Sequence, residues 1–319
     1  MIYRIDHFLT RTVQWLGGTE GSVWNKITDV FFAACTFMCE EMFILALVFV
    51  FYWALNKKTA QYMLLSMFGA VSVNGLVKSC VMRYRPFLNP DFADLRYVRM
   101  DNVFVDTVHL ENSFSFPSGH SQTTGAMFPT LGLLSGRKKY LILSFVLVVL
   151  VMMSRVYLGV HYPTDTIVGA ALGIGTAFLV VKVLNRDYSK RFMLYFICLG
   201  ILAATLILEI ILYSVGKDIN SLPDTAKMLG TAAGGIGGLL IEEKYIKFDV
   251  GGVWWKRVLR VVIGFAVVMG IRLGVKALFD AVMPEQGIAA ECVFGAIRYA
   301  MIGVFAAAGW PAIFKKIKL

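Results

Sequence analysis

The chain has 319 residues, of which 58% are hydrophobic and only 16% are charged. Soluble domains average about 45–50% apolar and about 25% charged residues, so this composition excludes a soluble globular enzyme and a disordered protein. The 31 Lys and Arg exceed the 21 Asp and Glu, which gives a formal net charge of +10. In so apolar a chain this excess indicates basic loops beside a membrane rather than nucleic-acid binding.

The N-terminal segment, residues 1–32, has the pattern of an amphipathic helix. Its apolar side chains recur at helical spacing, with polar residues between them. The apolar set comprises Ile2, Ile5, Phe8, Leu9, Val13 and Leu16. Because the segment also carries Arg4, Asp6 and Arg11, it is too polar to cross a bilayer, and we expect it to lie in the membrane interface.

Apolar stretches long enough to cross a bilayer follow along the rest of the chain. A spanning helix needs about 20 predominantly apolar residues. The sequence predicts about nine such helices, at about residues 33–55, 59–79, 118–135, 139–159, 163–184, 192–214, 223–241, 257–279 and 289–311. We therefore expect an all-α polytopic membrane helix bundle, with five spans in a domain at 33–189 and four in an extension at 190–319.

Basic residues gather in alternate connections between the predicted spans. They follow the first, third, fifth and seventh spans and close the chain at 315–318. Positive charge marks cytoplasmic loops, so the sequence predicts a cytoplasmic C-terminus and, with nine spans, an N-terminus outside. The polar stretch 83–116 and the turn 155–162 then lie on the external face.

Three polar clusters occur where predicted spans meet that external face. The first, residues 78–86, contains Lys78 and Arg85. The second is Pro117-Ser118-Gly119-His120, and the third, residues 154–165, contains Arg155, His161 and Asp165. Hydropathy and cytoplasmic lysines alone predict this topology, so the arrival of all three clusters at one membrane face is independent support for a shared site.

The residue types in these clusters suit phosphoryl transfer. Lys78, Arg85 and Arg155 provide cations for the charged oxygens of a phosphoryl group. Ser118 and Gly119 begin a predicted helix, whose N-terminal backbone N–H groups favour an anion. Of the two histidines, one can attack phosphorus and the other can protonate the leaving oxygen. Asp165 follows His161 by four residues, a spacing that places its carboxylate beside the imidazole if a helix has begun.

These motifs, at their full spacing, resemble the signature of the type-2 phosphatidic acid phosphatase superfamily. The resemblance covers residues 78–165 and implies metal-independent hydrolysis of phosphate esters, without a cofactor, by a catalytic core at 33–189. It implies a phosphohistidine on His161, His120 as the acid and Asp165 as the residue that orients His161. The phosphate-binding residues that it implies are Lys78, Arg85, Ser118, Gly119 and Arg155. The predicted nine-span layout also resembles that of glucose-6-phosphatase.

The sequence leaves the substrate open. A site at the lipid interface favours the phosphate monoester or pyrophosphate of a membrane lipid, such as phosphatidic acid, phosphatidylglycerol phosphate or a polyprenyl pyrophosphate. The alternatives are a sugar phosphate, a phosphotransferase that uses another acceptor than water, and a lipid transporter or binding protein. The complete set of His120, His161 and Asp165 argues against transport alone. Vanadium haloperoxidases resemble the same constellation, but they are soluble, and the oligomeric state stays open.

Two further features bear on location and on access to the site. The Lys-rich end 315–318 is off the dilysine retrieval spacing and the chain has no Asn-x-Ser/Thr sequon, which favours a bacterial plasma membrane over an endoplasmic reticulum.

Residues 87–114 form either a lid or an inert surface loop. Arg83 has two equal interpretations, one at the site and one at the interface, and we expect a surface or structural role for His7.

Overall fold

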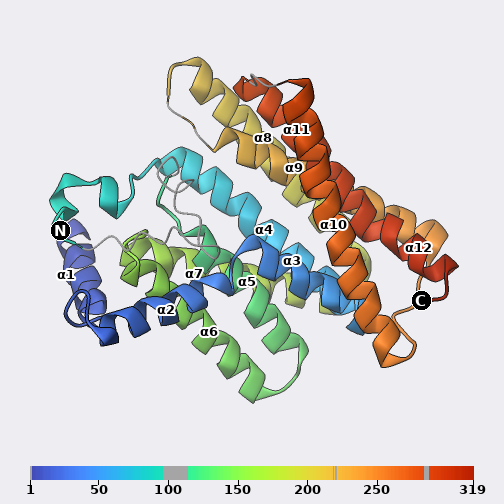
Figure 1. Cartoon of the computed structure of the whole chain (residues 1–319), viewed down its shortest axis with the longest axis horizontal. Coiled ribbons are helices and arrows are strands. Elements are labelled where there is room, and N and C mark those ends of the chain that lie inside the picture. Colours follow the sequence, from blue (N-terminus) through green and yellow to red (C-terminus); the bar gives the residue numbers. More distant parts are fainter. Residues whose placement is uncertain (1, 96–113, 218, 220, 284–286) are drawn as a thin grey trace. The chain divides into compact units, whose positions relative to one another are not determined.

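The computed structural model describes residues 2–95, 114–217, 219, 221–283 and 287–319 (Figure 1). Throughout these ranges the regular elements are helices. The chain divides into two compact units. The first comprises Met1–Ile44 and Tyr62–Tyr188, and the second comprises Leu45–Gln61 and Ser189–Leu319. Residues 96–113 lie outside the described residues, and so does most of the stretch in which a lid was one expectation.

The first unit contains the three sequence clusters. Its helices are α1 (Ile2–Trp15), α2 (Val23–Phe37), α5 (Gly119–Leu134), α6 (Lys138–Tyr157) and α7 (Pro163–Arg186). It also holds the start of α3 (Glu41–Val50), most of α4 (Lys57–Val81) and the short 3-10 turns Pro86–Leu88 and Pro90–Phe92. Helices α5, α6 and α7 (green) pack against one another in this unit (Figure 1).

Glycines set how closely α5 and α7 approach. A Cβ atom on Gly173 would lie 2.0 Å from the carbonyl oxygen of Gln122, and one on Gly169 would lie 2.5 Å from that of Ser118. A Cβ on Gly125 of α5 would lie 2.8 Å from the carbonyl oxygen of Ala170. Small residues allow helix backbones to pack this closely in a membrane. The contact brings the start of α5 against the start of α7.

The N-terminal helix α1 buries two polar side chains and exposes several apolar ones. The side chains of Asp6 and Thr10 are fully buried in the first unit, whereas Phe8 and Trp15 are 68% and 79% exposed. The amphipathic helix expected from the sequence is therefore present. Its location in the membrane interface stays a prediction, and the exposed aromatic face supports it.

The second unit is built on a close pair of helices. Its elements are α8 (Arg191–Ser214), α9 (Leu222–Ile241), α10 (Trp254–Val282), α11 (Ile288–Val304) and α12 (Trp310–Lys316), with single turns Phe51–Leu55, Glu242–Ile246 and Phe305–Gly309. Cβ atoms on Gly230 and Gly234 of α9 would each lie 2.1 Å from a carbonyl oxygen of α11, on Ala296 and Ala300. As in the first unit, small residues permit this packing.

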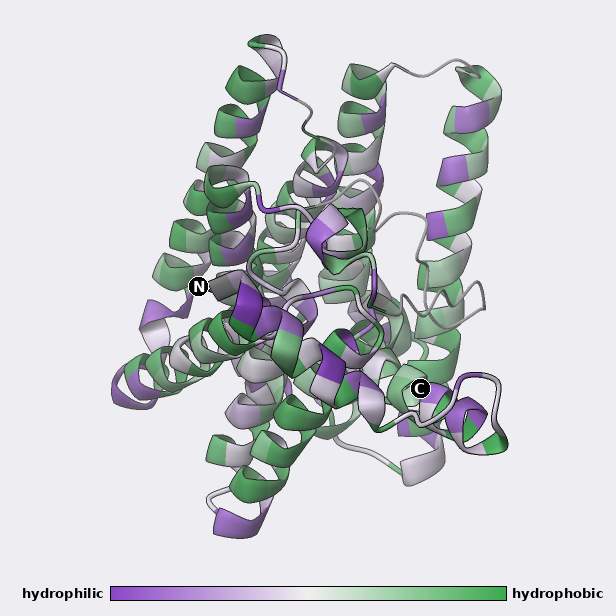
Figure 2. Ribbon diagram, turned by 90° about the vertical axis from the view of Figure 1, so that its left-hand side faces the viewer, coloured by the Kyte–Doolittle hydropathy of each residue, from purple (hydrophilic) through white to green (hydrophobic). Residues whose placement is uncertain are grey.

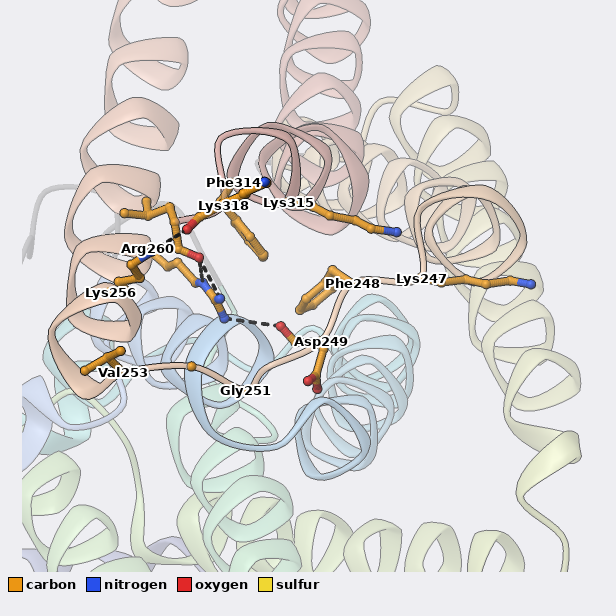
Figure 3. Close-up of a pocket in the computed structure, with 12 residues that line it drawn as sticks. Lys247, Phe248, Asp249, Gly251, Val253, Lys256, Arg260, Phe314, Lys315 and Lys318 are labelled. Carbon is orange, nitrogen blue, oxygen red and sulfur yellow. Dashed lines mark hydrogen bonds between the residues drawn. The ribbon is translucent and has the colours of Figure 1, made fainter.

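A cavity of about 400 Å³ lies within the second unit, beside the start of α10 (Figure 3). Basic residues line much of it, and three of them, Lys256, Arg260 and Lys315, donate to backbone carbonyls. Arg260 donates to Leu319 at 2.7 Å and to Asp249 at 3.2 Å, and Lys256 donates to Lys318 at 2.6 Å. Figure 3 shows the ammonium group of Lys247 pointing away from the cavity. These contacts tie the C-terminal residues to α10.

Six helical segments are long and apolar enough to cross a membrane. They contain α4, α6, α7, α8, α10 and α11. A seventh candidate is the pair Val23–Phe37 and Met42–Leu55, which is bent by 50°. Apolar residues dominate the long helices (Figure 2). The protein is thus an integral multi-pass membrane protein, but the prediction of nine spans is wrong for the described residues.

Three of the nine predicted spans differ for separate physical reasons. The span predicted at 118–135 is α5, whose 16 residues extend only about 24 Å at 1.5 Å per residue. The span at 223–241 is α9, which carries Asp224 and Lys227 in its first two turns and Gly or Ala at many later positions, and it is not among the candidate spans. The span at 33–55 is broken, because the chain turns after Phe37 with the Cys39 N–H donating to the Thr36 carbonyl at 3.0 Å.

Candidate active site

Four helix ends of the first unit bring the three clusters together. These are the C-termini of α4 and α6 and the N-termini of α5 and α7. The backbone N–H of Ser118 donates to the Asp165 carbonyl at 3.0 Å, which joins the second cluster to the third. Arg85 Nη1 donates to the Val160 carbonyl at 2.9 Å, which joins the first cluster to the third. The three motifs therefore form one site.

His161 lies in the tight turn between α6 and α7. Gly159 has a positive φ of 74°, which reverses the chain there, and Pro163 occupies the first position of α7. The imidazole is buried, with Nδ1 3.3 Å from the Ser115 hydroxyl and Nε2 3.2 Å from Arg85 Nη1. A guanidinium only donates, so Nε2 accepts this bond and Nδ1 carries the proton. The Nε2 lone pair consequently faces the cationic side of the site.

Asp165 lies on the opposite side of the His161 ring. Its Oδ2 is 3.5 Å from His161 Nδ1 and accepts the backbone N–H of Tyr162 at 3.0 Å. The Ser115 hydroxyl donates to the same oxygen, and Ser115 also contacts His161 Nδ1. The hydrogen bonds therefore run from the imidazole N–H to Ser115 and on to Asp165. Sequence reasoning missed Ser115, which precedes the second motif by two residues and belongs to none.

His120 begins the first turn of α5 and faces a carboxylate from another element. Its Nε2 lies 3.2 Å from Oε1 of Glu40, at the break between α2 and α3. An ionised carboxylate only accepts hydrogen bonds, so His120 Nε2 carries a proton toward Glu40. Glu40 belongs to none of the three clusters, so no motif indicated this pair.

Three cations surround the two histidines. Arg85 and Arg155 are buried, with 2% and 1% of their surface exposed, and Lys78 lies in the last turn of α4. Both histidines lie outside the six candidate spans. Burial, and then the charges of Arg85 and Arg155, hold the pKa of His161 well below its usual 6.5.

The pKa of His120 is also depressed. Burial, and then the charge of Arg155, lower it to about 4, while Glu40 acts in the opposite direction. Lys78 contributes a smaller lowering at both histidines. The cationic side of the site thus favours neutral imidazoles and is suited to an anion.

Ser118 and Gly119 form the start of α5. The Ser118 hydroxyl accepts the N–H of Ser121 at 3.4 Å, as an N-cap does, and its own backbone N–H is engaged by Asp165. Asn74 supports this turn from α4 by donating to the Pro117 carbonyl at 3.1 Å. Because the Ser118 N–H is engaged within the protein, the predicted anion contact of this helix end rests on Gly119.

Of the two interpretations of Arg83, the structure supports the one that places its side chain at the site. Its Nη1 donates to Asp165 Oδ1 and its Nη2 to Asp6 Oδ2, each at 2.7 Å.

His7 forms a surface pair with Asp94 at 2.8 Å, in agreement with the prediction. Within the described ranges, no group of three or more His, Cys, Asp or Glu side chains is arranged to hold a metal ion.

Comparisons with known proteins place the chain in a family. Residues 59–189 match the model of the PAP2 superfamily, and residues 226–319 match the model "PAP2 superfamily phosphatase, transmembrane extension". The chain is 36% identical over 157 residues to phosphatidylglycerophosphatase B of Bacillus subtilis (strain 168), which covers 46% of this chain and 68% of that relative. It is 40% identical over 116 residues to decaprenylphosphoryl-5-phosphoribose phosphatase of Mycobacterium tuberculosis, which covers 36% of this chain and 56% of that relative.

One solved structure is also similar. It is a crystal structure of the first transmembrane PAP2 type phosphatidylglycerolphosphate phosphatase from Bacillus subtilis. The match covers 58% of this chain and 87% of that chain, at 24% sequence identity and a TM-score of 0.45.

Proposed function

The chain belongs to the PAP2 superfamily, and from this premise we propose that it removes the phosphate monoester or pyrophosphate group of a membrane lipid through a phosphohistidine on His161. It is a phosphoric ester hydrolase of the lipid phosphate phosphatase type. The observation that carries the proposal is the orientation of His161. Its Nδ1–H faces Ser115 and Asp165, and its Nε2 faces Arg85.

In the first step, Lys78, Arg85 and Arg155 hold the phosphoryl oxygens, and the backbone N–H of Gly119 at the start of α5 completes the anion site. Their charges offset the negative charge that the oxygens carry in the transition state. His161 Nε2 attacks phosphorus, the bond from phosphorus to the ester oxygen breaks, and a phosphohistidine forms. Asp165 stabilises the positive charge that develops on the imidazole.

His120 provides the proton for the departing oxygen. A phosphate group among the three cations offsets their charges, so its binding raises the pKa of His120 from about 4. The Glu40 carboxylate then stabilises the imidazolium by accepting a hydrogen bond from its Nε2–H, and Nδ1–H is the proton that passes to the departing oxygen. In the second step His120 takes a proton from water, which attacks phosphorus and releases phosphate from His161.

The direction of the helices supports an external site. The basic turn between α5 and α6 lies at the opposite end of these helices from His120 and Arg155. With that turn in the cytoplasm, the site opens on the outer face of a bacterial plasma membrane. The two relatives named above are bacterial proteins, which supports the same location.

The substrate class follows the relatives. Both named relatives act on phosphorylated lipids, and the crowded cationic site is suited to such a headgroup. The nine-span likeness that raised a sugar phosphate is not shown by the structure, and no observation favours a phosphotransferase.

The test is phosphate release by the full-length protein reconstituted in vesicles. The panel contains phosphatidylglycerol phosphate, phosphatidic acid, undecaprenyl diphosphate and glucose 6-phosphate. We expect release from at least one lipid, with free phosphate equal to the dephosphorylated product. Release from glucose 6-phosphate alone would contradict the proposal, and dephosphorylated product in excess of free phosphate would indicate transfer to another acceptor.

A further inference from the structure

A buried ion-pair chain links the N-terminal helix to the proposed catalytic residues. Arg83 bridges the carboxylates of Asp6 and Asp165, with both distances equal to 2.7 Å. The side chains of Asp6 and Asp165 are 0% exposed, and that of Arg83 is 12% exposed. A guanidinium is suited to this bridge because its planar fork places separate donors toward two acceptors.

Further contacts hold Asp6 at the start of α7. Asp6 Oδ1 accepts the backbone N–H of Thr164 at 3.0 Å, and Oδ2 accepts the Thr164 hydroxyl at 2.8 Å. The carboxylate therefore occupies the positive end of a long helix, where a negative charge is favourable. The Arg83 guanidinium also lies 3.7 Å from the ring centre of Tyr162 and 5.0 Å from that of Tyr3.

We propose that Asp6 is a positioning residue for phosphoryl transfer, which acts through Arg83 and Asp165 on the imidazole of His161. This inference rests on the proposed role of His161 as the nucleophile. Asp6 lies outside residues 59–189, which match the family model. The proposal therefore makes a carboxylate of the N-terminal helix one of the groups that orient the His161 imidazole.

The physical reason lies in how Arg83 divides its charge. With Asp6 present, one cation serves two carboxylates, and Asp165 keeps negative charge on the oxygen that faces His161. Without Asp6, Arg83 is free to pair with Asp165 alone, which draws that carboxylate away from Ser115 and His161. The preference for a proton on Nδ1 then weakens, and so does the stabilisation of the charge that develops during attack.

The first test compares Asp6→Asn with Asp94→Asn in the reconstituted protein. Asp94 is a matched control because it also makes a carboxylate contact with α1, through His7 at the surface. We expect Asp6→Asn to lower kcat about tenfold with KM within about twofold, as the loss of a residue that orients a functional group does. Asp94→Asn is expected to leave both values unchanged.

Arg83→Lys provides a second variant, since one ammonium group does not reproduce the fork. We expect it to lower kcat in the same way. The kcat of the double variant Asp6→Asn/Arg83→Lys is expected to be no lower than the kcat of the less active single variant. The reason is that both changes break the same chain of ion pairs. Additive losses would overturn the proposal.

The second test reads the imidazole directly and needs no substrate. The chain has only 4 His, so the imidazole nitrogens of ¹⁵N-His-labelled protein can be assigned by single substitutions. We expect His161 to carry its proton on Nδ1 in the wild type and in Asp94→Asn, and to show mixed tautomers in Asp6→Asn. An activity loss with unchanged His161 signals would assign Asp6 a merely structural role and overturn the proposal. If the wild type releases no phosphate from any lipid while the His161 signals change as expected, the proposed function fails and the positioning link stands.

Discussion

Glu40 Oε1 lies 3.2 Å from His120 Nε2, so a carboxylate at the break between α2 and α3 faces the proposed acid at the start of α5. Burial opposes the charge on Glu40, but the hydrogen bond from His120 lowers the pKa of this carboxyl nonetheless. The pair gives the site a second carboxylate–imidazole unit beside that of Asp165 and His161. In the proposed mechanism, the Asp165–His161 unit serves attack on phosphorus and the Glu40–His120 unit serves departure of the alcohol.

Glu40→Gln removes the charge that supports the His120 imidazolium. Because Glu40 raises the pKa of His120, its loss lowers that pKa, and the basic limb of the kcat profile is expected to move to lower pH. At neutral pH we expect kcat to fall about tenfold. Kinetics over a pH series measure both effects, with Glu20→Gln at the exposed surface as the control. An unmoved basic limb would contradict the assignment of Glu40.

His161→Ala removes the proposed nucleophile. Turnover is expected to fall by about 10³-fold or more, whereas membrane insertion and folding persist. Phosphate release and the thermal unfolding of purified protein measure the two properties separately. His7→Ala serves as the control because His7 lies at the surface, and near-normal release by His161→Ala would refute the nucleophile.

The acid limb of kcat/KM reports the protonation of His161. Its pKa is held well below 6.5, and only the neutral imidazole can attack, so activity is expected to persist as the pH falls through 6.5. The decline begins only in more acidic solution, where His161 takes up a proton. A half-maximal value of kcat/KM at pH 6.5 or above would show that the site does not depress this pKa.

Gly173→Ala tests the close approach of α5 and α7. The new Cβ would lie 2.0 Å from the Gln122 carbonyl oxygen, so the helices must separate, at a cost of about 1–3 kcal/mol in the free energy of unfolding. Gly175→Ala on the same helix is a matched control, since nothing lies within 4 Å of its Cβ, and it is expected to stabilise by about 0.5–1 kcal/mol. Thermal unfolding in detergent measures both, and equal shifts would contradict the packing argument.

The sequence by itself determined the helical class, the membrane location and the residues of the three motifs. Hydropathy and motif spacing are local patterns, and each can be recognised from residues that lie close together in the chain. The turn that presents His161 is such a case, because Gly159 and Pro163 impose it on their own neighbours. The span count was less accurate, because α9 carries Asp224 and Lys227 beside the glycines that pack against α11.

The tertiary structure alone decided which groups support the two histidines. Asp6 and Arg83, and likewise Glu40 and His120, are 77 and 80 residues apart in the chain. Ser115 belongs to no motif, and the fold places it between His161 and Asp165. A polar side chain in an apolar sequence signals that it needs a partner, but the packing of the helices selects which partner it finds.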